Sequence, residues 1–289
     1  MTLFDARLAE RLLSACDAVA VWPLSVEAGW NQTVEDWRFL LGTGRGIGVR
    51  DAAGRWIGTA VALPLGARLA WLCMVLVARD ARRQGIGTHL LRRSIEAVRA
   101  SRAVTGLDAT ELGRPVYRPL GFEDLYTISR WRREGGDRLP PVPQARLVRR
   151  LAAADFPALT AFDERHSGMS RGTVLGHLAA RAPNRAFVAV NEGRLVGYAL
   201  GRPGRLAAQI GPVMAVDGEV ALALFHHALG ASTEPTMIDV PDKHGVVARW
   251  LQAGGAMRER GFTRMTLGEP PAGLSDAACI FALAGPELG

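Results

Sequence analysis

The spacing of apolar and polar residues changes along the chain, and each change marks the start of a different predicted element. Residues 71–77 are apolar at nearly every position, which predicts a strand buried on both faces of a sheet. From Thr88 onwards the apolar residues recur at helical spacing, at positions 90, 91, 95 and 98. The pattern therefore predicts a buried strand that runs through a short turn directly into an amphipathic helix.

Further elements are predicted on both sides of this strand and helix. In chain order they are helices over 6–20 and 34–41, strands over 47–51, 55–65, 104–110 and 122–131, and a short helix between the last two strands. Thr33 and Asp36 form a capping pattern at the start of the second helix, and residues 52–54 predict a tight hairpin turn. Strands and helices in this order indicate an α/β fold in which helices pack on a mixed sheet.

The order of elements is repeated in the second half of the chain. Its predicted elements are a strand over 146–150, helices over 153–165 and 171–181, and a hairpin of strands over 186–190 and 195–200. Short segments also correspond, namely Gly58-Thr-Ala with Gly197-Tyr-Ala, Val75-Leu-Val with Pro212-Val-Met, Leu107-Asp-Ala with Ile238-Asp-Val, and Leu120-Gly-Phe with Ala253-Gly-Gly. An internal duplication explains both observations.

A segment rich in glycine and proline separates the two halves. Residues 135–144 show no periodicity, as is typical of an interdomain linker. A chain of 289 residues is also long enough to form two hydrophobic cores. We therefore expect a first domain over 1–134, a linker over 135–144 and a second domain over 145–289.

Composition and charge narrow the class of protein. Hydrophobic residues make up 48% of the chain and charged residues 22%, as in ordinary globular proteins. The net charge of +7 comes almost entirely from arginines scattered among acidic residues, so nucleic acid is not an expected partner. The first residues lack a signal-peptide core and no apolar run is long enough for a membrane span, so we expect a cytoplasmic protein without a membrane partner. The 3 cysteines form no Cys-x-x-Cys pair, and neither disulfides nor a metal site are expected.

The turn between the buried strand and its helix has the residues of an anion site. Its sequence is Arg82-Arg83-Gln84-Gly85-Ile86-Gly87-Thr88. Because glycines have no Cβ, the backbone can approach a ligand closely, and the unpaired N–H groups of the first helical turn carry the positive end of the helix dipole. The two arginines add charge that suits phosphate oxygens. The turn is therefore predicted to bind phosphate groups.

The spacing Arg82-x-x-Gly85-x-Gly87 after a Val-x-Val strand resembles the acetyl-CoA motif of the GNAT superfamily of N-acetyltransferases. Residues 115–122 follow in the right order and resemble the fourth helix of this superfamily and its Tyr-x-x-x-Gly-Phe ending. The resemblance implies tandem GNAT folds, with acetyl-CoA as co-substrate and a small-molecule amine as the acceptor. It implies direct transfer through a tetrahedral intermediate, in a protein that is a monomer or a homodimer.

The resemblance also assigns residues to roles. Val75, Leu76 and Val77 are implied to pair with the pantetheine arm, where a peptide N–H can polarise the thioester carbonyl. The residues implied to hold the pyrophosphate are Arg82, Arg83, Gln84, Gly85, Ile86, Gly87 and Thr88. Tyr117 matches the tyrosine that acts as general acid in many members, although it could instead only pack under the sheet. Thr110 stands where many members have an asparagine that contacts the cofactor, so its hydroxyl is a candidate cofactor contact. No general base is apparent.

Four residues are candidate contacts for the acceptor. Trp30, Asn31 and Gln32 would form an exposed indole beside two amides, which suits a small polar acceptor, or they would only cap the helix that follows Thr33. Asp108 is either a carboxylate that faces the acceptor or the partner of a nearby arginine, which is the commoner role of a partly buried aspartate.

The second half lacks the features of the phosphate turn. At the corresponding place it has Asp217, Gly218 and Glu219, and these carboxylates would repel a pyrophosphate. The second domain is therefore predicted to be a degenerate GNAT-like domain without cofactor, with an unfilled cleft near Val213 and Ile238. Two other functions remain open, namely a non-catalytic module that binds or senses acetyl-CoA, and an acyltransferase similar to mycothiol synthases.

Overall fold

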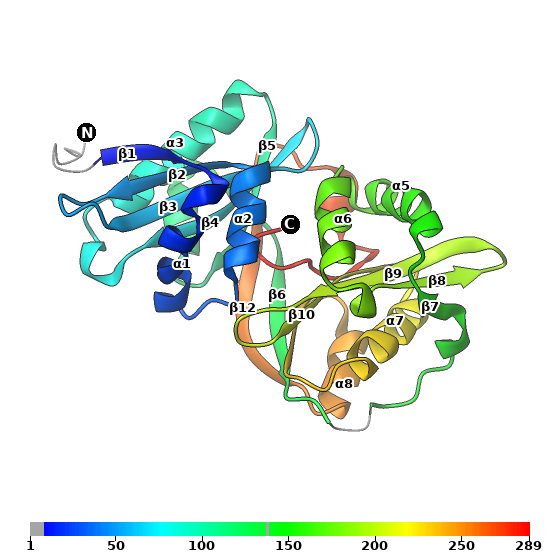
Figure 1. The fold of residues 1–289 in the computed structure, drawn as a ribbon. Helices are drawn as coiled ribbons and strands as arrows, with labels where there is room; N and C mark the ends of the chain where they lie inside the picture. Colours follow the sequence, from blue (N-terminus) through cyan, green and yellow to red (C-terminus); the bar gives the residue numbers. More distant parts are fainter. Residues whose placement is uncertain (1–8, 137–138) are drawn as a thin grey trace. The chain divides into compact units, whose positions relative to one another are not determined.

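The computed structural model describes residues 9–136 and 139–289, which form two compact units divided after Leu107 (Figure 1). We call residues up to 107 the N-terminal unit and residues 108–289 the C-terminal unit. The first repeat denotes residues 1–134 of the sequence, and the second repeat denotes residues 145–289. Both units combine strands and helices, as the predicted α/β fold requires.

The N-terminal unit contains a mixed sheet with helices around it. Its strands are β1 (Ala9–Leu13), β2 (Arg45–Arg50), β3 (Trp56–Pro64), β4 (Leu69–Val77) and the start of β5 (Val104–Thr110), and its helices are α1 (Ala18–Glu27), α2 (Val34–Thr43) and α3 (Ile86–Ala100). The first four strands are antiparallel to their neighbours, whereas β5 is parallel to β4. Helix α3 lies close to β3 because Gly58 has no side chain, and a Cβ there would lie 2.8 Å from Ile86. This close packing fixes the beginning of α3 beside the end of β4.

The structure tests the predicted starts of the first two helices. The capping pattern is confirmed, because the Asp36 carboxylate accepts from Thr33 N at 2.7 Å and Thr33 Oγ1 accepts from Asp36 N at 3.3 Å. The prediction of one helix over 6–20 is wrong for residues 9–13, which form β1, while residues 1–8 lie outside the described part. All five residues pair with β2, and among them only Leu13 is buried.

The C-terminal unit contains a longer mixed sheet. Its strands are β6 (Glu123–Arg133), β7 (Val148–Arg150), β8 (Phe187–Asn191), β9 (Arg194–Arg202), β10 (Ala208–Ala215), β11 (Thr236–Pro241), β12 (Met257–Leu267) and β13 (Ile280–Ala282). Its helices are α4 (Arg114–Tyr117), α5 (Phe156–Ser167), α6 (Gly172–Arg181), α7 (Gly218–Gly230), α8 (Gly245–Ala253) and α9 (Ala272–Asp276). The order along the sheet is β12, β6, β11, β10, β9, β8 and β7, and β13 pairs with β10.

The last strand of the first repeat is built into the second repeat. Strand β6 lies between β12 and β11 and is antiparallel to both. Residues 108–136 therefore belong to the same compact unit as the second repeat, which explains why the units divide after Leu107 instead of within 135–144. In the described part of this segment, Leu139 and Val142 pack against the core of the second repeat. The domain boundaries predicted at residues 134 and 145 describe the sequence repeats, and they stay a prediction.

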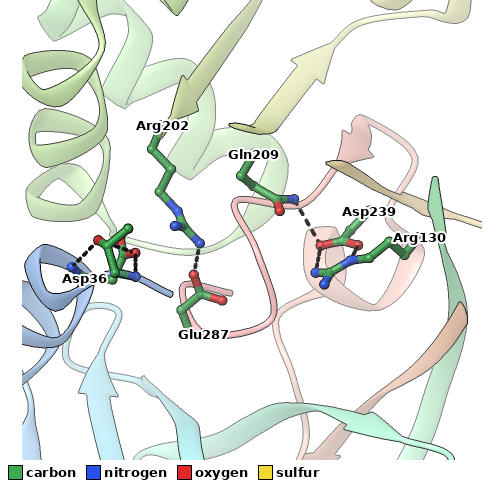
Figure 2. A network of polar contacts seen from close by, with 7 residues as sticks. Asp36, Arg130, Arg202, Gln209, Asp239 and Glu287 are labelled. Atoms are coloured by element: carbon green, nitrogen blue, oxygen red, sulfur yellow. Dashed lines mark hydrogen bonds and ion pairs between the residues drawn. The ribbon is translucent and has the colours of Figure 1, made fainter. Parts of the chain in front are cut away.

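Two buried ion pairs join the repeats within the C-terminal unit. Arg130 of β6 donates through Nε and Nη2 to both carboxylate oxygens of Asp239 in β11, each at 2.7 Å (Figure 2). Arg264 of β12 donates in the same way to Asp108 of β5, each at 2.8 Å. Gln209 adds a third hydrogen bond to Asp239 at 3.0 Å. Each repeat therefore supplies an arginine to an aspartate of the other.

The strand registers support the internal duplication and refine it. The equivalent antiparallel pairs are Gly58 with Val77 and Thr59 with Leu76 in the first repeat, and Gly197 with Ala215 and Tyr198 with Met214 in the second. Val75-Leu-Val therefore corresponds to Val213-Met-Ala, one residue later than the sequence comparison predicts. The difference arises because a register shift interrupts each pair of strands, and the sequence does not mark its position.

Candidate functional site

The start of α3 has the backbone geometry expected of a phosphate-binding turn. Gly85, the residue before the helix, has φ 80° and Arg83 has φ 61°, so both are left-handed. Within the described residues of the N-terminal unit, no side chain caps this helix. The N–H groups of Ile86, Gly87 and Thr88 therefore have no carbonyl partner one turn earlier in the helix and can bind an anion.

The arginines of this turn are placed at the surface. The side chains of Arg82, Arg83 and Gln84 are exposed, and Arg82 Nε donates to the Val77 carbonyl at 3.2 Å. This contact holds one face of the Arg82 guanidinium against the end of β4. The residues predicted to hold a pyrophosphate are consecutive and lie in this turn, and their contact with phosphate stays a prediction.

The strand that leads into the turn separates from its parallel neighbour. The pairing of β4 with β5 ends at Trp71 and Gly106. Beyond that point Met74 has φ 51°, and its carbonyl accepts from Thr59 Oγ1 at 2.9 Å. This irregularity precedes residues 75–77, the predicted contacts of the pantetheine arm. Because a separated strand edge leaves backbone groups that need partners, these residues can pair with an extended ligand that carries amides.

Tyr117 ends the short helix α4 in the C-terminal unit. Its ring is half-buried and meets Phe122 edge to face at 5.9 Å between centroids. Desolvation raises the pKa of its hydroxyl to about 12, so it is protonated at neutral pH. Among residues 108–289 no group forms a hydrogen bond with this hydroxyl. The hydroxyl therefore keeps its proton at neutral pH, and the role of Tyr117 as an acid stays a prediction.

Thr110, at the end of β5, takes part in a local turn. Its hydroxyl oxygen accepts from the Gly113 N–H at 3.1 Å, just before α4 begins. The hydroxyl proton can still be donated, because an oxygen that accepts one bond keeps its own proton. A cofactor contact by Thr110 stays a prediction.

The sequence left two roles open for Asp108, and the structure shows it as the partner of an arginine. Its carboxylate is fully buried and forms the ion pair with Arg264 described above. Burial raises the pKa of Asp108, and the Arg264 guanidinium opposes this rise. Both carboxylate oxygens are engaged, so Asp108 does not face an acceptor.

The expected exposed group at residues 30–32 is wrong as a surface feature. Asn31 and Gln32 are buried, at 2% and 6% exposure, and Trp30 is half-buried. The Gln32 carbonyl accepts from Trp22 Nε1 at 3.0 Å, which fixes this segment to α1.

Charged residues that the sequence did not single out surround a pocket of about 500 Å³ in the C-terminal unit, beside α4. They are Glu111, Arg114, Arg118, Asp242 and Arg258. The cross-strand pairs of β6 and β12 at Ile128 with Phe262 and Thr127 with Thr263 also line it. One signal could have indicated this pocket, since Glu111 and Asp242 take equivalent positions after the two Leu/Ile-Asp motifs of the repeats.

The charged groups of this pocket are partly engaged with one another. Arg114 and Arg118 both donate to Asp124. Arg258 Nε donates to Ser129 Oγ at 2.8 Å, and that hydroxyl donates to Asp242 at 2.6 Å. The Glu111 side chain is exposed and forms no ion pair or hydrogen bond with residues 108–289. The pocket thus presents carboxylates and arginines above a partly apolar floor.

The corresponding helix of the second repeat starts differently. Asp217 caps α7 and accepts from the Val220 N–H at 2.9 Å, whereas Glu219 accepts from Gln144 at 2.6 Å. A side chain therefore uses an N–H group that is free at the start of α3. The predicted loss of the phosphate turn in this repeat agrees with that geometry.

Two family models match the chain, one in each repeat. The model described as acetyltransferase (GNAT) family matches residues 13–122, and the model described as acetyltransferase (GNAT) domain matches residues 159–278. The uncharacterized N-acetyltransferase YitH of Bacillus subtilis (strain 168) is 26% identical over 219 residues, which are 75% of this chain and 77% of that protein.

Solved structures share the fold over nearly the whole chain. A putative acetyltransferase from Pyrococcus horikoshii gives a TM-score of 0.81 at 18% identity, covering 99% of this chain and 98% of that chain. A tandem GNAT protein from the clavulanic acid biosynthesis pathway gives a TM-score of 0.61 at 17% identity, covering 91% of this chain and 100% of that chain. The chain therefore belongs to the GNAT acetyltransferases, with two domains of that family in tandem.

Residues 9–136 and 139–289 include no group of three or more His, Cys, Asp or Glu side chains placed to hold a metal ion. No helix in the same ranges is long and apolar enough to cross a lipid bilayer.

Proposed function

We propose that this acetyltransferase moves the acetyl group of acetyl-CoA to a small amine, and that the first repeat carries the reaction. The observation that carries the proposal is the uncapped start of α3, with left-handed Gly85 and two exposed arginines. The chemistry of these donors fits phosphate groups, since backbone N–H groups and exposed guanidinium groups belong to the same turn. The corresponding helix of the second repeat is capped by a carboxylate, which favours the first repeat.

Each residue has a separate task in the proposed reaction. The first-turn N–H groups of α3 and the side chains of Arg82 and Arg83 would hold the phosphates, and the backbone of residues 75–77 would hold the extended arm. Acetyl-CoA supplies an activated thioester when bound. Tyr117 would supply the proton that the leaving sulfur needs, and because burial makes this tyrosine a weaker acid, it would keep this proton until negative charge develops beside it.

The cofactor site can be tested with Gly85→Asp. The substitution places a carboxylate against the bound phosphates, and Coulomb repulsion at such short range is expected to weaken acetyl-CoA binding at least about tenfold. Isothermal titration calorimetry on the purified chain measures the change. An unchanged affinity would place the cofactor elsewhere.

A matched control separates charge at the site from backbone strain. Gly54, in the turn between β2 and β3, has φ 81°, almost the same as Gly85 at φ 80°. Gly54→Asp therefore imposes similar strain on the N-terminal unit, and its acetyl-CoA affinity is expected to equal that of the parent. A loss of affinity in both variants would mean that strain, not the phosphate site, is responsible.

The pocket beside α4 is the proposed place of the acceptor. Its exposed Glu111 carboxylate can attract a protonated amine, whereas the buried amides of residues 31 and 32 are already packed inside. We expect Glu111→Gln to raise KM for the amine about three- to tenfold and to leave acetyl-CoA affinity unchanged. Steady-state kinetics with the best amine from a panel, measured by CoA release, checks this.

The control for the acceptor pocket is Glu123→Gln, which removes a nearby exposed carboxylate of β6 that does not line the pocket. Equal KM changes in both variants would indicate a general effect of charge and would rule out a specific contact. A non-catalytic module that only senses acetyl-CoA would bind the cofactor but release no CoA with any amine of the panel.

A further inference from the structure

The second repeat contains a strand that has no counterpart in the described residues of the N-terminal unit. In both repeats two parallel strands separate after three paired residues, β4 from β5 at Trp71 and Gly106, and β10 from β11 at Ile210 and Ile238. In the second repeat β13 pairs with β10 at Val213 and Met214, directly beyond the point of separation. The chain itself therefore occupies the gap between the separated strands.

Hydrogen bonds attach this segment to both sides of the gap. Ala215 of β10 donates its N–H to the Cys279 carbonyl at 3.1 Å, and the Leu283 N–H donates to the Asp239 carbonyl of β11 at 2.9 Å. Separated parallel strands have inner N–H and C=O groups that need partners, and residues 279–283 supply them. The contact has the form of an added strand, in which main-chain bonds provide the affinity.

Burial and close approach show that the segment is packed tightly. Residues 280–284 are each at most 4% exposed, and the Phe281 ring stacks on His244 at 4.1 Å. Gly211, at φ 148°, touches the segment so closely that a Cβ there would lie 1.8 Å from the Leu283 carbonyl oxygen. Only glycine allows the two backbones to approach in this way.

A second set of contacts holds the residues that follow. Glu287, which is buried, forms an ion pair with Arg202 of β9 (Figure 2). Arg171 donates to the carbonyl of Gly289. Residues 277–289, the tail segment, are thus fixed on both sides of the inserted strand.

We propose that the cleft of the second repeat is a site for an extended peptide and that its ligand is the tail segment of this same chain. The inserted strand lies beside β10, where an acyl-CoA arm would have to bind in the second repeat. This inference rests on the proposed binding of acetyl-CoA beside β4 in the first repeat. Acetyl-CoA therefore binds once per chain. The predicted unfilled cleft near Val213 and Ile238 is corrected accordingly, because β13 fills it.

The unaltered full chain provides the first test. Hydrogen exchange measured by mass spectrometry should show the Leu283 and Ala215 amides at least about a hundredfold slower than freely exposed amides of similar sequence. A labelled peptide with the sequence of residues 277–289 should not bind the unaltered chain. Fast exchange at both amides would overturn the proposal.

Two variants of the full chain then open the cleft. Gly211→Ala displaces the Leu283 carbonyl, and Leu283→Pro removes the N–H that donates to β11, so one variant remains if the other fails to fold. In either, exchange of the Ala215 amide should rise at least about tenfold. The labelled peptide should bind the Leu283→Pro variant in a fluorescence anisotropy titration but not the Gly211→Ala variant, because the Cβ at position 211 would meet the Leu283 carbonyl of the peptide as well. The control Gly193→Ala, at φ 75° with no atom within 4 Å of its Cβ, should do neither.

The outcomes distinguish this inference from the proposed function. If acetyl-CoA binds nowhere, the proposed function fails, while exchange and peptide binding still report on the tail segment. A stoichiometry of two acetyl-CoA per unaltered chain would overturn the inference and leave the first site intact. Unchanged exchange in a folded Gly211→Ala variant, or no peptide binding by a folded Leu283→Pro variant, would also overturn it.

Discussion

Tyr117→Phe is expected to lower kcat by about ten- to a thousandfold while acetyl-CoA affinity changes by no more than a few fold. The change removes one proton donor and leaves the ring, so packing against Phe122 is kept. Steady-state kinetics and calorimetry on the same preparation separate the two quantities. Equal turnover in variant and parent would reduce Tyr117 to a packing residue.

The pH dependence gives an independent check on the same residue. A general acid acts in its protonated form, so activity that depends on Tyr117 is present below its pKa and is lost as pH rises through about 12. We therefore expect kcat of the parent not to fall because of Tyr117 between pH 7 and pH 10. The control Tyr126→Phe removes another hydroxyl whose pKa burial raises, and it should leave kcat unchanged.

Arg264→Met is expected to destabilise the C-terminal unit by about 3–5 kcal/mol, because it leaves the Asp108 carboxylate buried without a partner. Urea unfolding followed by circular dichroism measures the change in the free energy of unfolding. The double variant Arg264→Met with Asp108→Leu should recover most of the loss, since a buried pair replaced by apolar residues often costs little.

A surface arginine serves as the control for this experiment. Arg132 of β6 pairs with Glu134, whose side chain is 62% exposed, and Arg132→Met should change the free energy of unfolding far less. A similar loss in both variants would contradict the view that burial makes the Arg264 pair essential.

The parts of the fold and site that could be predicted depend on neighbours in sequence. The turn before α3 is readable because its arginines and glycines, the preceding strand and the following helix are contiguous. The cap of α2 is readable for the same reason, as Thr33 and Asp36 are three residues apart. The GNAT fold of both repeats follows from such local motifs in the right order.

The parts that could not be predicted depend on partners far apart along the chain. Arg130 and Asp239 are separated by 109 residues, and Arg264 and Asp108 by 156. A spacing of apolar residues shows that β6 is a strand, but it does not show which strands lie on either side. Residues 277–284 are a continuous apolar run that could have indicated a buried strand, but its place in the gap depends on Gly211, far away in the sequence. The burial of residues 31 and 32 likewise results from packing and not from their polar character.

The two buried ion pairs also define a relation between the repeats. The left-handed glycines Gly121 and Gly255 are equivalent, which moves the match by one residue from the Gly254 of the sequence comparison. Arg130 and Arg264 each stand nine residues after these glycines, so the two arginines are equivalent. Their aspartate partners occupy equivalent positions in the two Leu/Ile-Asp motifs. If two identical copies of one repeat formed these two ion pairs, the arginine of each copy would bind the aspartate of the other, as at a two-fold axis. Residues 108–289 therefore contain, within one polypeptide, the reciprocal contact expected at the interface of a symmetric dimer.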